Sequence, residues 1–127
     1  MSDTTTDGIR VQVTPAFWPE RSSIDAEQWA FTYRIVITNI GQAPATLKHR
    51  HWIITDGTGR IEEVRGEGVV GKCPRLEPGE SFEYSSWVML KTPFGTMRGE
   101  YFMERSRTHR FAAHIGEFVL AMPNSLN

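Results

Sequence analysis

Cysteine is nearly absent from this chain, whose only example is Cys73. A single thiol cannot form an internal disulfide, and the N-terminal sequence MSDTTTDG has neither the basic segment nor the apolar segment of a secretory signal peptide. Long apolar runs are missing too, because none approaches the roughly 20 residues that a membrane-spanning helix needs. The sequence therefore predicts a cytoplasmic location and no membrane partner.

An excess of charge of either sign is also missing. The formal net charge is -1, and charged residues make up 23% of the chain. Because no large basic field is present to attract nucleic acid, we expect no nucleic-acid partner. A chain of 127 residues, 39% of them hydrophobic, has the size and composition of one globular domain. We expect a single domain over residues 1–127, with a short flexible tail at about residues 1–8, which are polar and rich in Thr and Asp.

Signatures of common catalytic and metal sites do not occur either. The chain has no G-x-S-x-G elbow to place a serine on a strained turn, and no C-x-x-C or H-E-x-x-H spacing to hold zinc. Serines, histidines and carboxylates are present, as in almost any chain of this length, but no spacing makes them a catalytic triad. We expect no enzymatic activity and no cofactor.

What the sequence does contain is alternation of apolar and polar residues with a period of two. It is clearest in WAFTYRIVITN, where the residues on one face are Trp29, Phe31, Tyr33, Ile35 and Ile37. No segment has helical apolar spacing with caps. About seven strands are predicted, near residues 9–15, 29–39, 46–54, 60–64, 81–90, 96–104 and 111–122. Short strands without crossover helices predict an all-β fold, most simply a sandwich of two antiparallel sheets.

The segment RGEGVVG fits the G-x-G-x-x-G pattern of dinucleotide-binding loops. Its three glycines are Gly66, Gly68 and Gly71. In such loops a helix follows and directs its N-terminal N–H groups at the phosphate. The two valines before Gly71 are poor helix formers, and Pro74 lies where the first turns of the helix would run. We interpret the glycines as serving a tight turn, with a small anion-binding loop as the alternative.

Two histidines, His49 and His51, lie two residues apart on one predicted strand. Both imidazoles therefore face the same side, roughly 7 Å apart. Such a pair binds a transition metal when a third ligand arrives from a neighbouring strand, and His109 and His114 are candidates. The alternative is that His49 and His51 sit at a half-buried surface and form hydrogen bonds there.

Two tryptophans, Trp52 and Trp87, fall opposite the main apolar sets of their predicted strands. This position predicts a partner-facing aromatic patch. A slip of one residue in register would instead place both rings in the core, because it moves every side chain to the other face.

Three stretches, read in order, resemble the ApaG family: HRHWIITDGTG, VRGEGVVGKCPRLEPGESFEYSS and LKTPFGTMRGEYFM. The resemblance covers most of the chain and implies a small bacterial protein with a fibronectin type III-like β-sandwich. Related domains occur in eukaryotic F-box proteins and in a polymerase-delta-interacting protein, so the resemblance also implies protein binding. It further implies an association with cobalt resistance and magnesium efflux. The family has no established catalytic residues to carry over.

Two hypotheses about function follow. The first is a non-catalytic interaction module, which holds an unidentified protein partner through an exposed strand edge or an aromatic patch. The second is a small-ligand or divalent-metal binding protein, which uses the strand of His49 and His51 or the glycine-rich loop 66–71.

Overall fold

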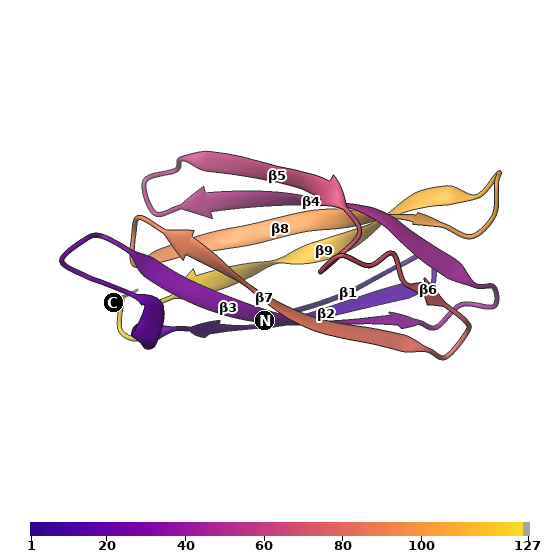
Figure 1. Ribbon diagram of the computed structural model, residues 1–127, viewed down its shortest axis with the longest axis horizontal. Helices are drawn as coiled ribbons and strands as arrows, with labels where there is room; N and C mark the ends of the chain where they lie inside the picture. Colours follow the sequence, from indigo (N-terminus) through magenta and orange to yellow (C-terminus); the bar gives the residue numbers. More distant parts are fainter. Residues whose placement is uncertain (126–127) are drawn as a thin grey trace.

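Two antiparallel sheets pack face to face in the computed structural model, which describes residues 1–125 (Figure 1). One sheet has the strand order β1-β2-β3-β7, and the other has the order β5-β4-β8-β9, with β6 paired to β4. The bounds are Ser2–Thr6 (β1), Ile9–Phe17 (β2), Trp29–Asn39 (β3), Ala45–Asp56 (β4), Ile61–Glu67 (β5), Arg75–Leu76 (β6), Ser81–Leu90 (β7), Phe94–Glu104 (β8) and Arg110–Ala121 (β9), with a 3-10 turn, η1, at Pro19–Arg21. The predicted all-β sandwich is confirmed.

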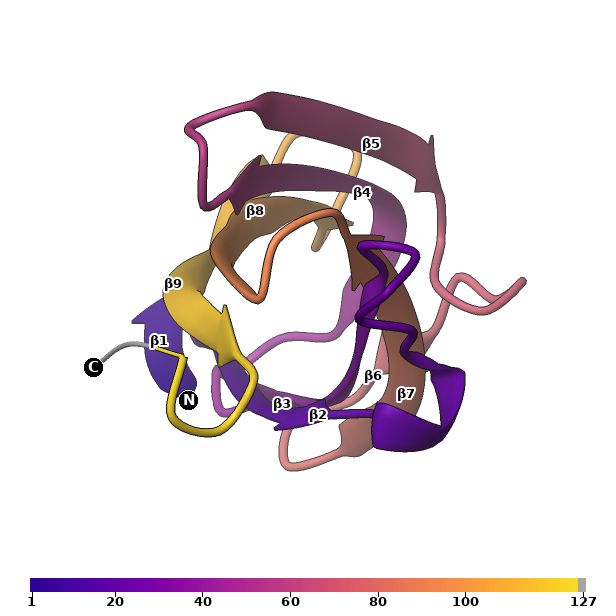
Figure 2. The same cartoon turned by 90° about the vertical axis from the view of Figure 1, so that its left-hand side faces the viewer.

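The core lies between the two sheets and is built by the period-two residues. The five alternating apolar residues of β3 are all buried, with Phe31 1% exposed and both Ile35 and Ile37 fully buried. Strand β9 packs against β1 and β2, which closes the sandwich along one side (Figure 2). The described residues include no helix that is long and apolar enough to cross a membrane.

The N-terminal segment is a strand, so the prediction of a flexible tail over residues 1–8 was wrong. Strand β1 pairs with β2 from Ser2 opposite Val13 to Thr6 opposite Ile9. The Thr6 hydroxyl oxygen accepts a hydrogen bond of 3.1 Å from the backbone N–H of His114 in β9. Threonine is β-branched and suits a pleated, half-buried strand, but a polar composition hides this in the sequence.

A β-bulge in β4 decides which of its side chains face the core. The register against β8 shifts between Leu47 and His49, so one extra residue is inserted there. Leu47 is fully buried before the bulge, and Trp52 and Ile54 are 3% and 8% exposed after it. The prediction of an exposed Trp52 was therefore wrong, because the bulge reverses the face of every later residue in β4.

Three tyrosines, Tyr33, Tyr84 and Tyr101, are buried in the core. The hydroxyl oxygens of Tyr84 and Tyr101 lie 2.5 Å apart and share a hydrogen bond. Burial raises the pKa of all three phenols above its ordinary value, because the charged phenolate would lose its hydration.

Alkaline pH is expected to destabilise the fold through these phenols. In the unfolded chain a tyrosine loses its proton near pH 10, whereas the buried phenols keep theirs to higher pH. The unfolded state then binds fewer protons, so the free energy of unfolding falls as pH rises above about 10 and is unaffected by these groups below it. Denaturant unfolding at a series of pH values measures the decrease. Tyr84→Phe should make it shallower, and an unchanged slope in that variant would contradict this account.

Candidate functional site

An aromatic patch lies on the outer face of the four-stranded sheet. Trp87 of β7 is 54% exposed, and Met89, on the same face, is 36% exposed. Trp18, which precedes η1, packs edge-on against Trp87 with ring centroids 6.1 Å apart and an interplanar angle of 82°. The guanidinium carbon of Arg21 lies 5.7 Å from the centre of the Trp18 ring. We call these four residues the tryptophan patch.

The alternation of β7 places Trp87 there. Tyr84 and Leu90 are buried on the inner face, whereas Ser85, Trp87 and Met89 are exposed on the outer face. No bulge interrupts the pairing of β7 with β3, so the face expected from the sequence is the face observed. The role of Trp87 in binding stays a prediction.

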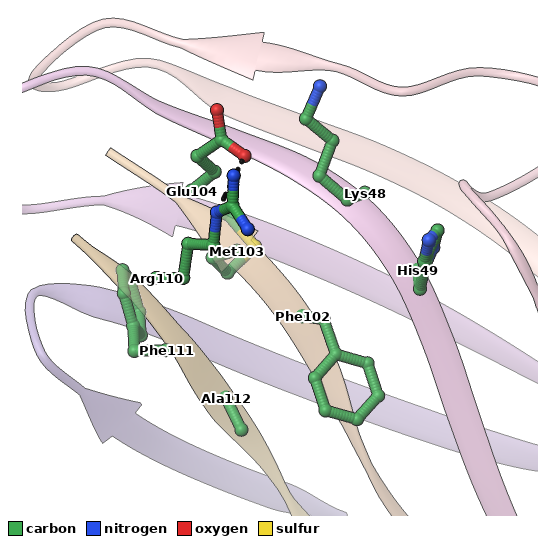
Figure 3. A pocket seen from close by; sticks show the side chains of 8 residues that line it. All are labelled: Lys48, His49, Phe102, Met103, Glu104, Arg110, Phe111 and Ala112. Atoms are coloured by element: carbon green, nitrogen blue, oxygen red, sulfur yellow. Dashed lines mark ion pairs between the residues drawn. The ribbon is translucent and has the colours of Figure 1, made fainter. Parts of the chain in front are cut away.

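A hollow of about 540 Å³ lies on the outer face of the five-stranded sheet (Figure 3). It is lined by Lys48, His49, Phe102, Met103, Glu104, Arg110, Phe111 and Ala112. Phe102 lies between His49 and Ala112, its cross-strand neighbours, and is 37% exposed. Arg110 Nε and Glu104 Oε2 form an ion pair of 3.3 Å at one rim. A further hollow of about 360 Å³ shares His49 and Phe102 and reaches Arg65.

Sequence reasoning missed the contribution of Phe102 to this surface. The signal was its position in β8, where it follows Thr96, Arg98 and Glu100 at intervals of two and therefore belongs to the polar set. An aromatic ring in the outward set of a strand is half-exposed unless another layer covers it.

The two histidines of β4 share the outer face, as their spacing predicted, but their surroundings differ. His49 is exposed at the rim of the hollow, whereas His51 is 7% exposed. His51 Nε2 lies 2.7 Å from Glu63 Oε1, and His51 Nδ1 lies 3.6 Å from Glu100 Oε1. The hydrogen-bonding alternative therefore describes His51.

The other two histidines do not complete a metal site with this pair. His114 is two strands away from His51, with Glu100 between them in the cross-strand row, and strand spacing puts them roughly 10 Å apart. His109 Nε2 lies 2.7 Å from Asp7 Oδ2. Across residues 1–125 no three His, Cys, Asp or Glu side chains are grouped so that they could hold a metal ion.

The glycine-rich loop is a tight turn that leads into β6 rather than into a helix. Val69 and Lys72 exchange two backbone hydrogen bonds of 2.8 and 2.9 Å, and Val70 and Gly71 between them have φ angles of 44° and 78°. Positive φ at both central residues is the geometry of a type I′ turn. The N–H of Gly68 donates to the Lys48 carbonyl oxygen at 2.9 Å, so these N–H groups are occupied and do not face an anion.

Arg50 holds the start of the same loop. Its Nη1 donates to the carbonyl oxygens of Glu67 and Gly68 at 3.1 and 2.9 Å. A Cβ on Gly66 would lie 2.6 Å from Arg50 Nη2, so a larger residue would push this guanidinium away. The glycine at position 66 thus allows close packing by an arginine, which is a structural use of the motif.

Alanine at position 68 is expected to lower the free energy of unfolding by about 2 kcal/mol. Gly68 has a φ of 61°, and a Cβ there would collide with the Lys72 carbonyl oxygen. Gly71 is the matched control, because it has a φ of 78° and a Cβ added to it would meet no atom within 4 Å. Gly71→Ala should therefore cost only about 1 kcal/mol, for the backbone conformation alone. Urea unfolding measures both values, and equal costs would contradict the collision at Gly68.

Comparison with known proteins identifies the family. A family model described as the ApaG domain matches residues 19–105. Protein ApaG of Ralstonia nicotianae is 53% identical over 119 residues, which are 94% of this chain and 96% of that protein. Protein ApaG of Dechloromonas aromatica is 52% identical over 127 residues, covering both chains completely. The crystal structure of the ApaA protein from Bordetella pertussis has a TM-score of 0.90 at 48% identity and covers 96% of this chain and 99% of that one. The chain therefore belongs to the ApaG domain family.

Proposed function

We propose that this protein is a non-catalytic interaction module that binds a protein partner through the tryptophan patch. The observation that carries the proposal is the exposure of Trp87, 54% of whose surface is open to solvent on a regular strand. A partner that covers apolar surface gains about 25 cal/mol for each Å² removed from water. Tryptophan is among the residues that most often dominate the binding energy of an interface.

The tryptophan patch has an apolar centre with polar groups around it, as protein–protein interfaces do. Its centre consists of Trp18, Trp87 and Met89, and the ion pair of Arg34 Nε with Glu83 Oε1, 2.7 Å long, lies along the same outer face. An apolar centre beside polar, solvated groups is the usual arrangement of a protein–protein contact. We propose that the module acts in the cytoplasm, and that any effect on cobalt resistance or magnesium efflux is exerted through the bound protein.

A photoreactive phenylalanine derivative at position 87 tests this function in living cells. We expect a discrete cross-linked product at position 87 and none from the same derivative at position 119, because Val119 is 48% exposed but lies on the other sheet. The product should disappear when unlabelled wild-type protein competes and persist when Trp87→Ala competes. Cross-linking of equal strength at both positions, or at neither, would remove the support for the tryptophan patch.

A second candidate function is small-ligand binding, which the hollow of about 540 Å³ around Phe102 favours. Lys48 and His49 suit an anionic group, whereas Arg110 is already paired with Glu104. Phe102 offers a ring for an apolar group to pack on. Aromatic carboxylates, added to isotope-labelled protein, test it. Saturable amide shifts confined to this hollow and abolished by Phe102→Ala would support the second function, and their absence up to millimolar concentration would reject it.

A further inference from the structure

Strand β7 is an edge strand, and most of its length lacks the charges that β5, an edge strand of the other sheet, carries. Within residues 1–125, β7 pairs only with β3, and that pairing has no bulge. Its segment Tyr84–Leu90, YSSWVML, contains no charge, proline or glycine. Strand β5, at the edge of the other sheet, instead reads IEEVRGE. Charges on an edge discourage pairing with another chain, whereas a regular uncharged edge permits it.

A cleft of about 310 Å³ opens between the two sheets beside this edge. Arg50, Trp52 and Val64 line it from β4 and β5, and Ser86 and Val88 line it from β7. Figure 2 shows β5 standing apart from β7 on this side, whereas β9 and β1 lie together on the other. In the described part of the chain, β5 packs extensively only against β4, and its inward residue Val64 is only partly buried against the core.

We propose that the partner binds by adding an extended segment to β7 as a further strand, which covers the cleft. The proposal rests on the protein-binding function above and specifies its mode. Side chains of an added strand alternate between two faces. One set lies beside Trp87 and Met89 on the outer face, and the other enters the cleft between Trp52 and Val88.

The residues that line the cleft indicate the chemistry of the peptide segment that would bind there. Trp52, Val64 and Val88 are apolar, so the inward side chains next to them are aliphatic. Arg50 brings a guanidinium to the cleft while its Nη1 bonds to the loop carbonyls, so an inward carboxylate at that level completes its remaining donors. Glu62 also lines the cleft, but it lies opposite Ile54 in the register, away from Arg50, so the peptide carboxylate belongs at the Arg50 end. The partner segment is therefore an extended peptide that alternates aliphatic residues and carries one inward acidic residue.

A second copy of this chain fits the cleft less well than a single extended segment. In a symmetric pairing of β7 with β7, the inward side chains of the second copy, including Tyr84 and Leu90, are already buried beneath its own other sheet. They cannot also enter the cleft of the first copy.

Selection from a displayed library of random linear peptides of about 12 residues, longer than a typical strand, tests this mode of binding. The probe is the most enriched peptide, prepared synthetically, and we expect it to alternate aliphatic residues with an acidic residue on the inward side. Amide hydrogen exchange is the decisive readout. Every second amide from Tyr84 to Leu90 points away from β3, and these amides should exchange quickly in the free protein and slowly in the complex.

Two adjacent glutamate substitutions provide matched variants. Ser86→Glu places a carboxylate in the cleft that Arg50 also lines, where it competes with the peptide carboxylate for this guanidinium and repels it. Ser86→Glu should therefore weaken the peptide by about tenfold or more, whereas Ser85→Glu, on the exposed outer face, should weaken it by less than about threefold. Thermal unfolding verifies that both variants fold. If Ser86→Glu does not fold, the exchange pattern of the wild-type complex still decides.

Three results would overturn strand addition: no peptide is enriched, a bound peptide leaves the outward amides of β7 unprotected, or light scattering shows a dimer whose formation protects them without peptide.

Failure of the proposed function, which is binding through the tryptophan patch, gives a different combination of results. If the peptide protects β7 but cross-linking at position 87 yields no product, the edge binds peptides while the tryptophan patch holds no partner. If cross-linking succeeds and β7 stays unprotected, the patch stands and strand addition fails.

Discussion

Trp52→Ala is expected to lower the free energy of unfolding by about 3–5 kcal/mol, as large-to-small changes at fully buried aromatic positions do. The ring of Trp52 packs against Tyr33, Tyr101 and Phe118, with ring centroids 5.4, 6.4 and 6.0 Å away. These neighbours come from both sheets, so the variant leaves a cavity between the sheets that neither can close alone. Chemical denaturation monitored by circular dichroism measures the loss.

Trp87→Ala is the matched control, because it removes the same side chain from the outer face. Trp87 is 54% exposed, and in the described part of the chain its aromatic contact is the ring of Trp18, so the expected cost is about 1 kcal/mol or less. A cost below about 1 kcal/mol for Trp52→Ala would show that the faces of β4 are assigned wrongly, and an equally large cost for Trp87→Ala would show the same of β7.

Asn39→Ala is expected to cost about 3–4 kcal/mol, because three hydrogen bonds are lost and buried polar groups are left without partners. Asn39 is fully buried at the end of β3. Its Nδ2 donates to the carbonyl oxygens of Ala43 and Leu76, both at 2.9 Å, and its Oδ1 accepts from the Gly41 N–H at 3.0 Å. The side chain thus joins the loop after β3 to β6.

Arg105 extends this arrangement to the N-terminal turn. Its guanidinium donates to the Asp7 carbonyl oxygen at 2.7 Å and to the Ala43 carbonyl oxygen, and lies 3.5 Å from Asn39 Oδ1. Thr38→Ala is the control for Asn39→Ala. Among residues 1–125, the Thr38 hydroxyl bonds only to Ser81, at an exposed position, so its removal should cost about 1 kcal/mol or less. Costs of similar size at the two positions would contradict a buried polar network at Asn39.

The residues of the candidate site were predictable where local alternation is uninterrupted. Trp87 lies on the outer face because β7 pairs with β3 without a bulge, and the sequence alone places it there. Trp52 was assigned to the wrong face because the bulge between Leu47 and His49 depends on the pairing of β4 with β8. The hollow around Phe102 was missed for a related reason, since it forms between side chains of three strands that no local pattern brings together.

The sequence by itself determined the fold class and the seven main strands, because a period of two and the placement of turn residues are local properties of the chain. It also favoured a turn over a phosphate loop for the glycine-rich segment, because two valines and a proline disfavour the helix that a phosphate loop requires. Only the tertiary structure decided the rest. It decided that the threonine-rich N-terminus pairs with β2, which face of β4 carries Trp52, that Arg105 bonds to the N-terminal turn, and that β7 has a free edge. All four depend on which strand lies beside which, and those contacts join residues far apart in the chain.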